Sequence, residues 1–113
     1  MNKDFKLFQK EFKKWQEKFG LMGYTIYFKH EPLDEAFADI EIRQGEMVAS
    51  VRLSNKLTDK NKLYRDIKMD AKHEAIHLLV GRLSENAGYR YSSKAEIYEA
   101  TEELVNKLCN LIP

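Results

Sequence analysis

Cysteine, proline and glycine are scarce in this chain of 113 residues, which contains one cysteine, two prolines and five glycines. The single cysteine, Cys109, excludes an internal disulfide, so we expect a protein of a reducing compartment, the cytoplasm. So few prolines and glycines argue against a disordered linker. The length fits one domain, which we take to be residues 1–113.

Charge of one sign and long apolar runs are also missing. The 19 basic and 18 acidic residues leave a net charge of +1, which gives no overall attraction to nucleic acid or to an anionic membrane. No apolar run approaches the roughly 18 residues that span a bilayer, and the first residues lack the apolar segment of a secretion signal. Hydrophobic residues still make up 43% of the chain. We therefore expect a small soluble domain with a packed core and no membrane attachment.

The N-terminal segment, residues 3–19, is predicted to be a helix. Five aromatic residues recur at steps of three and four, so they share one stripe of a helix: Phe5, Phe8, Phe12, Trp15 and Phe19. Lysines occupy the other faces. This pattern predicts a helix that packs on the core and keeps a solvated basic side. The alternative is a helix that docks on a partner or on nucleic-acid phosphates.

Three strands are predicted next, around residues 24–28, 38–43 and 47–54, because apolar and polar residues alternate there. A period of two with one apolar face is typical of an antiparallel sheet packed on one side. A turn with positive φ at Gly45 is expected between the last two strands.

Two helices complete the predicted order. The first spans about 62–83, a loop follows at 84–93, and the last helix begins at a capping box formed by Ser93 and Glu96. The fold class is therefore α+β. We expect an antiparallel sheet of about three strands packed on the two C-terminal helices, with the N-terminal helix on the outside.

The sequence His73-Glu74-Ala75-Ile76-His77 is an HExxH motif inside the first of these two helices. Residues i and i+4 lie on the same face of a helix, so the two imidazoles can reach one tetrahedral zinc ion. Glu74 flanks that ion and can take a proton from a water molecule on it. Shuffling this composition produces HExxH in only roughly half a percent of trials. The alternative is a pair of surface histidines on an amphipathic helix.

A zinc hydrolase needs a third protein ligand and an open fourth position. His30 lies at the end of the first predicted strand, and the last helix offers Glu96, Glu99, Glu102 and Glu103. With about 100° per residue, the apolar residues of that helix place Glu102 at the edge of its buried face and turn Glu99 and Glu103 to solvent. Glu102 is the expected ligand, and a solvated boundary glutamate is the alternative.

These motifs resemble the gluzincin branch of zinc metallopeptidases. There a second helix supplies a glutamate ligand, and an Asp or Asn four residues later supports the first histidine. The segment from Glu102 to Asn106 matches, with Asn106 in the supporting place. The layout is similar to phage and mobile-element metallopeptidases of the ImmA/IrrE-like kind and to SprT-like domains. It departs from their pattern because the full Glu-x-x-Ala-Asn-x-Phe-Ala signature is reduced to Glu-x-x-Val-Asn and no helix-turn-helix is attached.

The resemblance implies a minimal zincin fold and a zinc cofactor. It also implies a cytoplasmic peptidase that cleaves one specific protein, such as a repressor. In that plan an edge strand borders the cleft, where an extended peptide can bind by strand addition. Two other function classes stay open: a zincin-fold binding module without hydrolysis, and a nucleic-acid-associated protein that uses the lysines of the first helix. The intact Glu74 counts against the former, and the near-neutral charge against the latter.

Weaker candidates surround the motif. Tyr89 and Tyr91, in the loop between the two site helices, are possible donors for an oxyanion; an ordinary loop packed on the core is the alternative. Asp66 and Asp70 lie on the same helix face as the histidines. They could orient an imidazole by a hydrogen bond, or they could simply be acids that the helix dipole favours near the start of the helix. Cys109 is expected in the core, with a fourth, thiolate ligand as the alternative.

Overall fold

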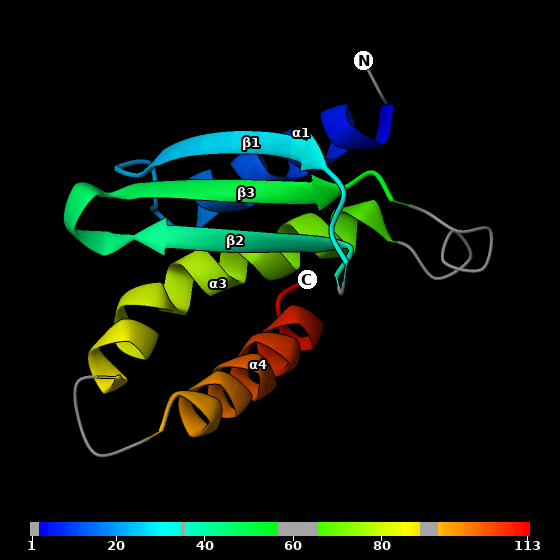
Figure 1. The fold of residues 1–113 in the computed structure, drawn as a ribbon. Coiled ribbons are helices and arrows are strands. Elements are labelled where there is room, and N and C mark those ends of the chain that lie inside the picture. Colours follow the sequence, from blue (N-terminus) through cyan, green and yellow to red (C-terminus); the bar gives the residue numbers. More distant parts are fainter. Residues whose placement is uncertain (1–2, 35, 57–65, 89–92) are drawn as a thin grey trace.

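The computed structural model describes residues 3–34, 36–56, 66–88 and 93–113 (Figure 1). Its elements follow in the order α1 (Lys3–Lys18), β1 (Thr25–Glu31), β2 (Ala38–Arg43), the short 3-10 helix η1 (Gln44–Glu46), β3 (Val48–Ser54), α3 (Ile67–Ala87) and α4 (Lys94–Leu111). The α+β class and the predicted order of helices and strands are confirmed. Within these ranges, no helix combines the length and the apolar character needed to cross a membrane.

The sheet is mixed, which corrects the expectation of an antiparallel one. Its strand order is β1-β3-β2, with β1 parallel to β3 and β2 antiparallel to β3. The alternation of apolar residues indicates which face of a strand is buried. The same alternation occurs in parallel and antiparallel pairs, so it could not predict the direction of pairing. The turn before β3 also differs, because the residue with positive φ is Met47, at 53°, and not Gly45.

Helices α1 and α3 cover the same face of the sheet (Figure 1). Phe8 and Phe12 of α1 are fully buried against Val51 and Leu53 of β3. The prediction that this helix packs on the core through its aromatic stripe is confirmed, and the expectation that it lies on the outside of the fold is wrong. Its aromatic stripe carries too much apolar surface to be a peripheral cover, since each buried phenylalanine removes about 150–250 Å² from water.

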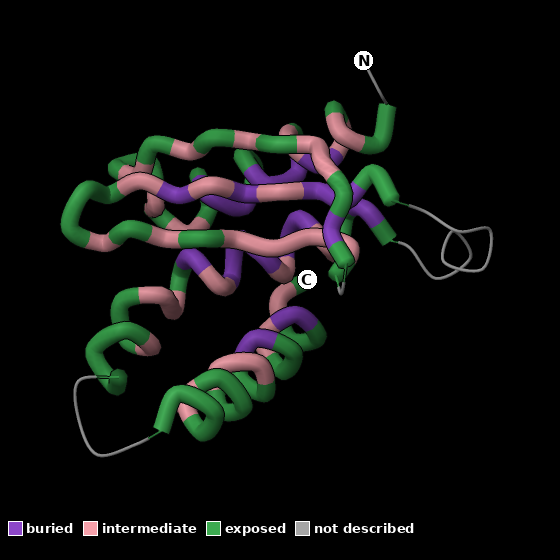
Figure 2. Tube along the Cα trace, viewed as in Figure 1, coloured by how far each residue is buried: buried purple, intermediate pink, exposed green. Residues whose placement is uncertain are grey.

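Helix α4 is the peripheral element. Of its residues only Val105 and Cys109 are buried, and they pack with Ile76 of α3 in a small second core. Figure 2 shows the contrast between this mostly exposed helix and the buried residues of β3. Helix α3 ends at Ala87, so residues 84–87 of the predicted loop are helical. The part of the predicted helix before residue 66 lies outside the described residues.

A buried lysine of α3 holds the C-terminal end of α4. Lys72 is 8% exposed, and its Nζ donates to the carbonyl oxygen of Cys109 at 2.8 Å and to that of Ile112. The ammonium also lies 5.2 Å from the centre of the Trp15 ring. Cys109 lies in the last turn of α4 and Ile112 caps it, and a cation is favoured at this end of a helix by the helix dipole.

Replacing this lysine should destabilise the fold without touching the HExxH side chains. Lys72→Met keeps the apolar stem but loses the charged donor, so the free energy of unfolding should fall by about 1.5–3 kcal/mol. Urea denaturation measures the change. The exposed Lys10 of α1 supplies the control, because Lys10→Met should stay within about 0.5 kcal/mol. Equal effects of the two substitutions would contradict the role of Lys72.

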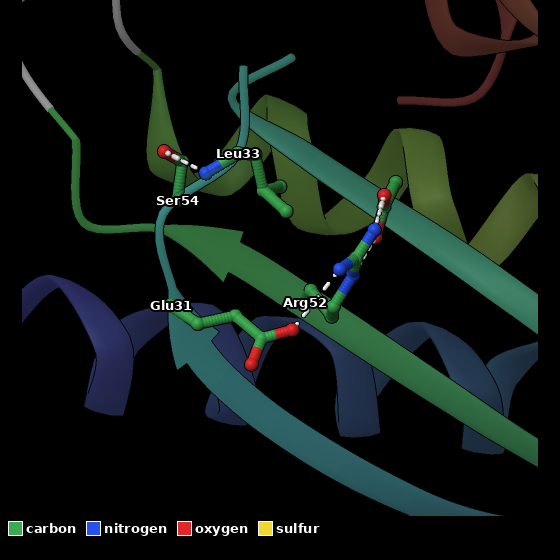
Figure 3. A network of polar contacts seen from close by, with 5 residues as sticks. Glu31, Leu33, Arg52 and Ser54 are labelled. Atoms are coloured by element: carbon green, nitrogen blue, oxygen red, sulfur yellow. Dashed lines mark hydrogen bonds and ion pairs between the residues drawn. The ribbon is translucent and has the colours of Figure 1, made fainter. Parts of the chain in front are cut away.

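Arg52 joins all three strands on the other face of the sheet (Figure 3). Its Nε donates to Oδ1 of Asp39 at 2.7 Å, Nη2 donates to Oδ2 of the same residue, and Nη1 donates to Oε1 of Glu31 at 3.0 Å. Hydrogen bonds to Asp39 and Glu31 raise the pKa of Arg52 above its ordinary value. At the same end of the sheet the N–H of Leu33 donates to Oγ of Ser54. The network fixes the beginning of β2, the strand that borders the candidate site.

Candidate metal centre

The HExxH residues lie in the middle of α3, as predicted. Asp66 is the N-cap of this helix and accepts a hydrogen bond from the N–H of Met69 at 3.1 Å, which decides between the two readings of that residue in favour of a role at the helix start. One turn of helix separates His73 from His77, and their Nε2 atoms are 3.2 Å apart. The local helix therefore turns both imidazoles toward one point.

Glu102 of α4 reaches the same point. Its Oε1 lies 2.8 Å from Nε2 of His77, and its Oε2 lies 3.6 Å from Nε2 of His73. Zinc–ligand distances of about 2.0–2.2 Å in a tetrahedral site separate neighbouring ligand atoms by roughly 3.3–3.6 Å. The three groups thus lie close enough to hold a metal ion, and two imidazoles with one carboxylate leave a fourth position open.

The rotation of α4 selects Glu102 over its neighbour. The side chain of Glu102 is 28% exposed, whereas that of Glu103 is 67% exposed and pairs with Lys107. The buried residues of the helix are Val105 and Cys109, and Leu104 is 39% exposed. The sequence placed Glu102 at the edge of the buried face, and the observed rotation of the helix brings it further inward.

Glu74 lies beside this cluster and is only 6% exposed. Burial raises its pKa to about 8, and the negative charges of Asp39, Glu102 and Asp70 add to the shift. A divalent cation at the convergence point opposes this shift, because an opposite charge favours the carboxylate. A carboxyl with a pKa in this range can both accept a proton and return it near neutral pH.

Burial also lowers the pKa of His77, although the carboxylate of Glu102 opposes the change. The neutral imidazole is the form that binds a metal ion. Burial therefore favours the ligating state of this side chain, whereas the carboxylate of Glu102 favours the protonated one.

The outer nitrogen of His73 faces a thiol. Sγ of Cys109 lies 3.8 Å from Nδ1 of His73, and burial raises the pKa of Cys109. Cys109 thus approaches the ring from the side opposite to Nε2, which does not suit a fourth ligand of the same ion. Asn106, expected from the resemblance to support this histidine, is exposed. In the sequence, the contact of Cys109 with the site was indicated by its position seven residues after Glu102, which places it two turns further along the same face of the helix.

The third histidine is not part of the cluster. The ring of His30 stacks on that of Phe5, with centroids 4.9 Å apart, so it serves packing. Tyr89 and Tyr91 lie outside the described residues. Tyr98, for which the sequence pattern predicted no role, lines the site pocket. Its spacing of four residues before Glu102 places it on the same helix face.

The site pocket has a volume of about 360 Å³ and is walled by three elements. Helix α3 contributes the HExxH residues and α4 contributes Tyr98 and Glu102. Residues of β2, among them Ala38 and Ile40, form the third wall. Because β2 is an edge strand of the described sheet, the pocket opens along a side that no other described strand covers.

Comparisons with protein-family profiles, with curated proteins and with solved structures find no match for this chain. An assignment of function therefore depends on the geometry of the site and on the chemistry of its side chains. The resemblance to gluzincins likewise depends on the HExxH motif and on the segment from Glu102 to Asn106.

Proposed function

We propose that this chain is a zinc-dependent metallopeptidase that hydrolyses a peptide bond in a specific cytoplasmic protein, such as a repressor. One observation carries the proposal: two imidazole nitrogens and the Glu102 carboxylate converge next to the buried carboxyl of Glu74. A purely structural metal site needs no such carboxyl, because nothing in it has to accept a proton. The same observation argues against a binding module that has kept only the fold.

The residues divide the work of hydrolysis among them. Zinc bound by His73, His77 and Glu102 would polarise the scissile carbonyl and acidify a water molecule. Glu74 accepts the proton of the attacking water and returns it to the leaving nitrogen. A tyrosine hydroxyl donates to the developing oxyanion: Tyr98 lines the pocket, and Tyr89 and Tyr91 keep the role predicted from the sequence.

The open side of β2 supports binding of an extended peptide. The N–H of Ser54 donates to the carbonyl of Phe37 at 2.7 Å, so the backbone of Phe37 faces β3. Backbone groups alternate along an antiparallel pair, and those of Ala38, Ile40 and Ile42 therefore point to the open edge. A peptide added there gains main-chain hydrogen bonds and passes the metal ligands.

The first test of the proposal is metal content. We expect about one zinc ion per chain after native purification, because three ligands converge on one point. At free zinc about 100-fold above its dissociation constant, the folded state should gain about 2.7 kcal/mol, which raises the melting temperature. Elemental analysis and thermal melting with and without zinc measure both effects.

The chain offers a matched control for this test. His73→Ala should abolish the zinc-dependent rise of the melting temperature, whereas His30→Ala should preserve it, because His30 stacks on Phe5 away from the cluster. A wild-type chain that stays metal-free when offered zinc would refute the metallopeptidase. Bound zinc without cleavage of any peptide would instead favour the binding module.

A further inference from the structure

A second pocket adjoins the site pocket, further along β2. It has a volume of about 360 Å³ and shares Ile40, His77, Ser84 and Thr101 with the site pocket. Beyond the shared residues its walls include Ile42, Gln44 and Gly81. A peptide paired with the edge of β2 directs alternate side chains to the face that carries Ile40 and Ile42. A side chain of such a peptide, close to the scissile bond, can therefore reach this second pocket.

The amide of Gln44 is held in one orientation. The hydroxyl of Tyr24 donates to Oε1 of Gln44 at 2.5 Å, which fixes that atom as the acceptor and leaves Nε2 as a donor. Nε2 lies over α3, where a Cβ added to Gly81 would be only 2.8 Å away. Across the part of the chain that the structure describes, no acceptor is seen for Nε2. Gln44 therefore presents N–H groups to the pocket.

The hydroxyl of Ser84 presents a hydrogen-bond acceptor to the pocket. Oγ1 of Thr101 donates its single proton to the carbonyl of Ile97 at 2.7 Å. In the contact of 3.0 Å between Ser84 and Thr101, Ser84 must then be the donor. Its remaining lone pairs are acceptors, and Ser84 lines both pockets. The second pocket thus offers a donor at Gln44 and an acceptor at Ser84, with apolar walls between.

The two polar groups limit what this pocket accepts. An ionised acidic side chain is an acceptor only, so it can pair with Gln44 but leaves the acceptor of Ser84 unpaired. A lysine or arginine has donors only and leaves the N–H groups of Gln44 unpaired, and an aliphatic side chain leaves both Gln44 and Ser84 unpaired.

We propose that this second pocket is a subsite for a carboxamide side chain, glutamine or asparagine, next to the scissile bond of the substrate. The inference rests on the proposed peptidase function. The carbonyl of the substrate amide accepts from Nε2 of Gln44, its NH2 group donates to Oγ of Ser84, and its methylene groups contact Ile40 and Ile42. Gln44 and Ser84 are specificity-determining residues, and Tyr24 is a positioning residue that acts through Gln44.

The test is a cleavage profile. The zinc-loaded full chain is incubated with a randomised peptide mixture, and the products are sequenced by mass spectrometry. Glutamine or asparagine should be enriched at one fixed position beside the cleaved bond by about tenfold or more over leucine, because a site built for hydrogen bonds rejects a side chain that lacks them.

Gln44→Glu keeps the size and shape of the side chain but replaces the Nε2 donor by an acceptor oxygen. Tyr24 can still donate to one carboxylate oxygen, while the former Nε2 position becomes an acceptor, so the preference should move from carboxamides to lysine and arginine. Tyr24→Phe should weaken the preference without reversing it, because the amide is then free to turn over. Asn110→Asp, an added carboxylate on an exposed residue of α4 that lines neither pocket, should leave the profile unchanged.

Zinc content and circular dichroism establish that each variant is folded and loaded. A Gln44→Glu profile identical to that of the wild type overturns the subsite, as does wild-type cleavage with no selection for a carboxamide at a fixed position. In both cases the peptidase itself stands. Failure of the zinc-loaded wild type to cut any peptide overturns the peptidase, and the subsite with it.

Discussion

Glu74→Gln should retain zinc and the native fold but lose hydrolysis by about 10²–10⁴-fold, the usual contribution of a general base. The substituted amide has nearly the same shape as the carboxyl, so it fits the same buried space beside the metal ligands. It cannot accept the proton of the attacking water. Steady-state cleavage of a peptide selected by the wild type, together with zinc analysis, measures the two consequences separately.

Stability should not suffer from this substitution. The wild-type carboxyl is buried near Asp39 and Glu102, and these surroundings disfavour its charge. A neutral amide avoids that electrostatic cost, so the metal-free variant should melt no lower than the wild type. A loss of activity together with a lower melting temperature would point to damaged structure and not to a missing base.

Glu41→Gln is the matched control, because it makes the same chemical change on β2 at a side chain that is 77% exposed. Its activity should equal that of the wild type. Hydrolysis by Glu74→Gln at the parental rate would refute the peptidase mechanism. Absence of cleavage by both the variant and the wild type would leave the binding module as the better reading.

Local sequence patterns predicted the part of the site that lies on one helix. The spacing of His73 and His77 fixes their common face as soon as the segment is helical, and the apolar periodicity of that segment indicates a helix. The position of Glu102 required the rotation of a second helix. The helical wheel selected Glu102, which does lie beside the two histidines, although it placed Val105 at the margin of the buried face where the structure buries Val105 and Cys109.

Features that depend on tertiary packing could not be predicted from the sequence. The alternation in residues 24–28 and 47–54 is the same whether two strands run parallel or antiparallel, so the direction of β1 relative to β3 could not be predicted. The contact of Cys109 with His73 and the pairing of Lys72 with the end of α4 join residues 36 and 37 positions apart. No periodicity within one segment reports such contacts, which arise only when α3 and α4 pack together.

Glu102→Ala should weaken zinc binding by more than about 100-fold, because even the partners that merely orient a ligand are typically worth 10–100-fold. The variant loses one of three protein ligands. It also removes the carboxylate that lies 2.8 Å from Nε2 of His77. Competition with a chromogenic chelator gives the zinc dissociation constant of wild type and variant at the same pH.

Glu103→Ala is the neighbouring control, and we expect it to be nearly silent. Its side chain is 67% exposed and pairs with Lys107 one turn later, an exposed i,i+4 pair worth about 0.3–0.5 kcal/mol. The two substitutions remove the same chemical group from positions about 100° apart on α4, so their difference reports the rotation of the helix. Because Val105 and Cys109 are buried on the face that carries Glu102, the large loss belongs to Glu102. Equal affinities, or a larger loss at Glu103, would mean that α4 presents a different face to the histidines.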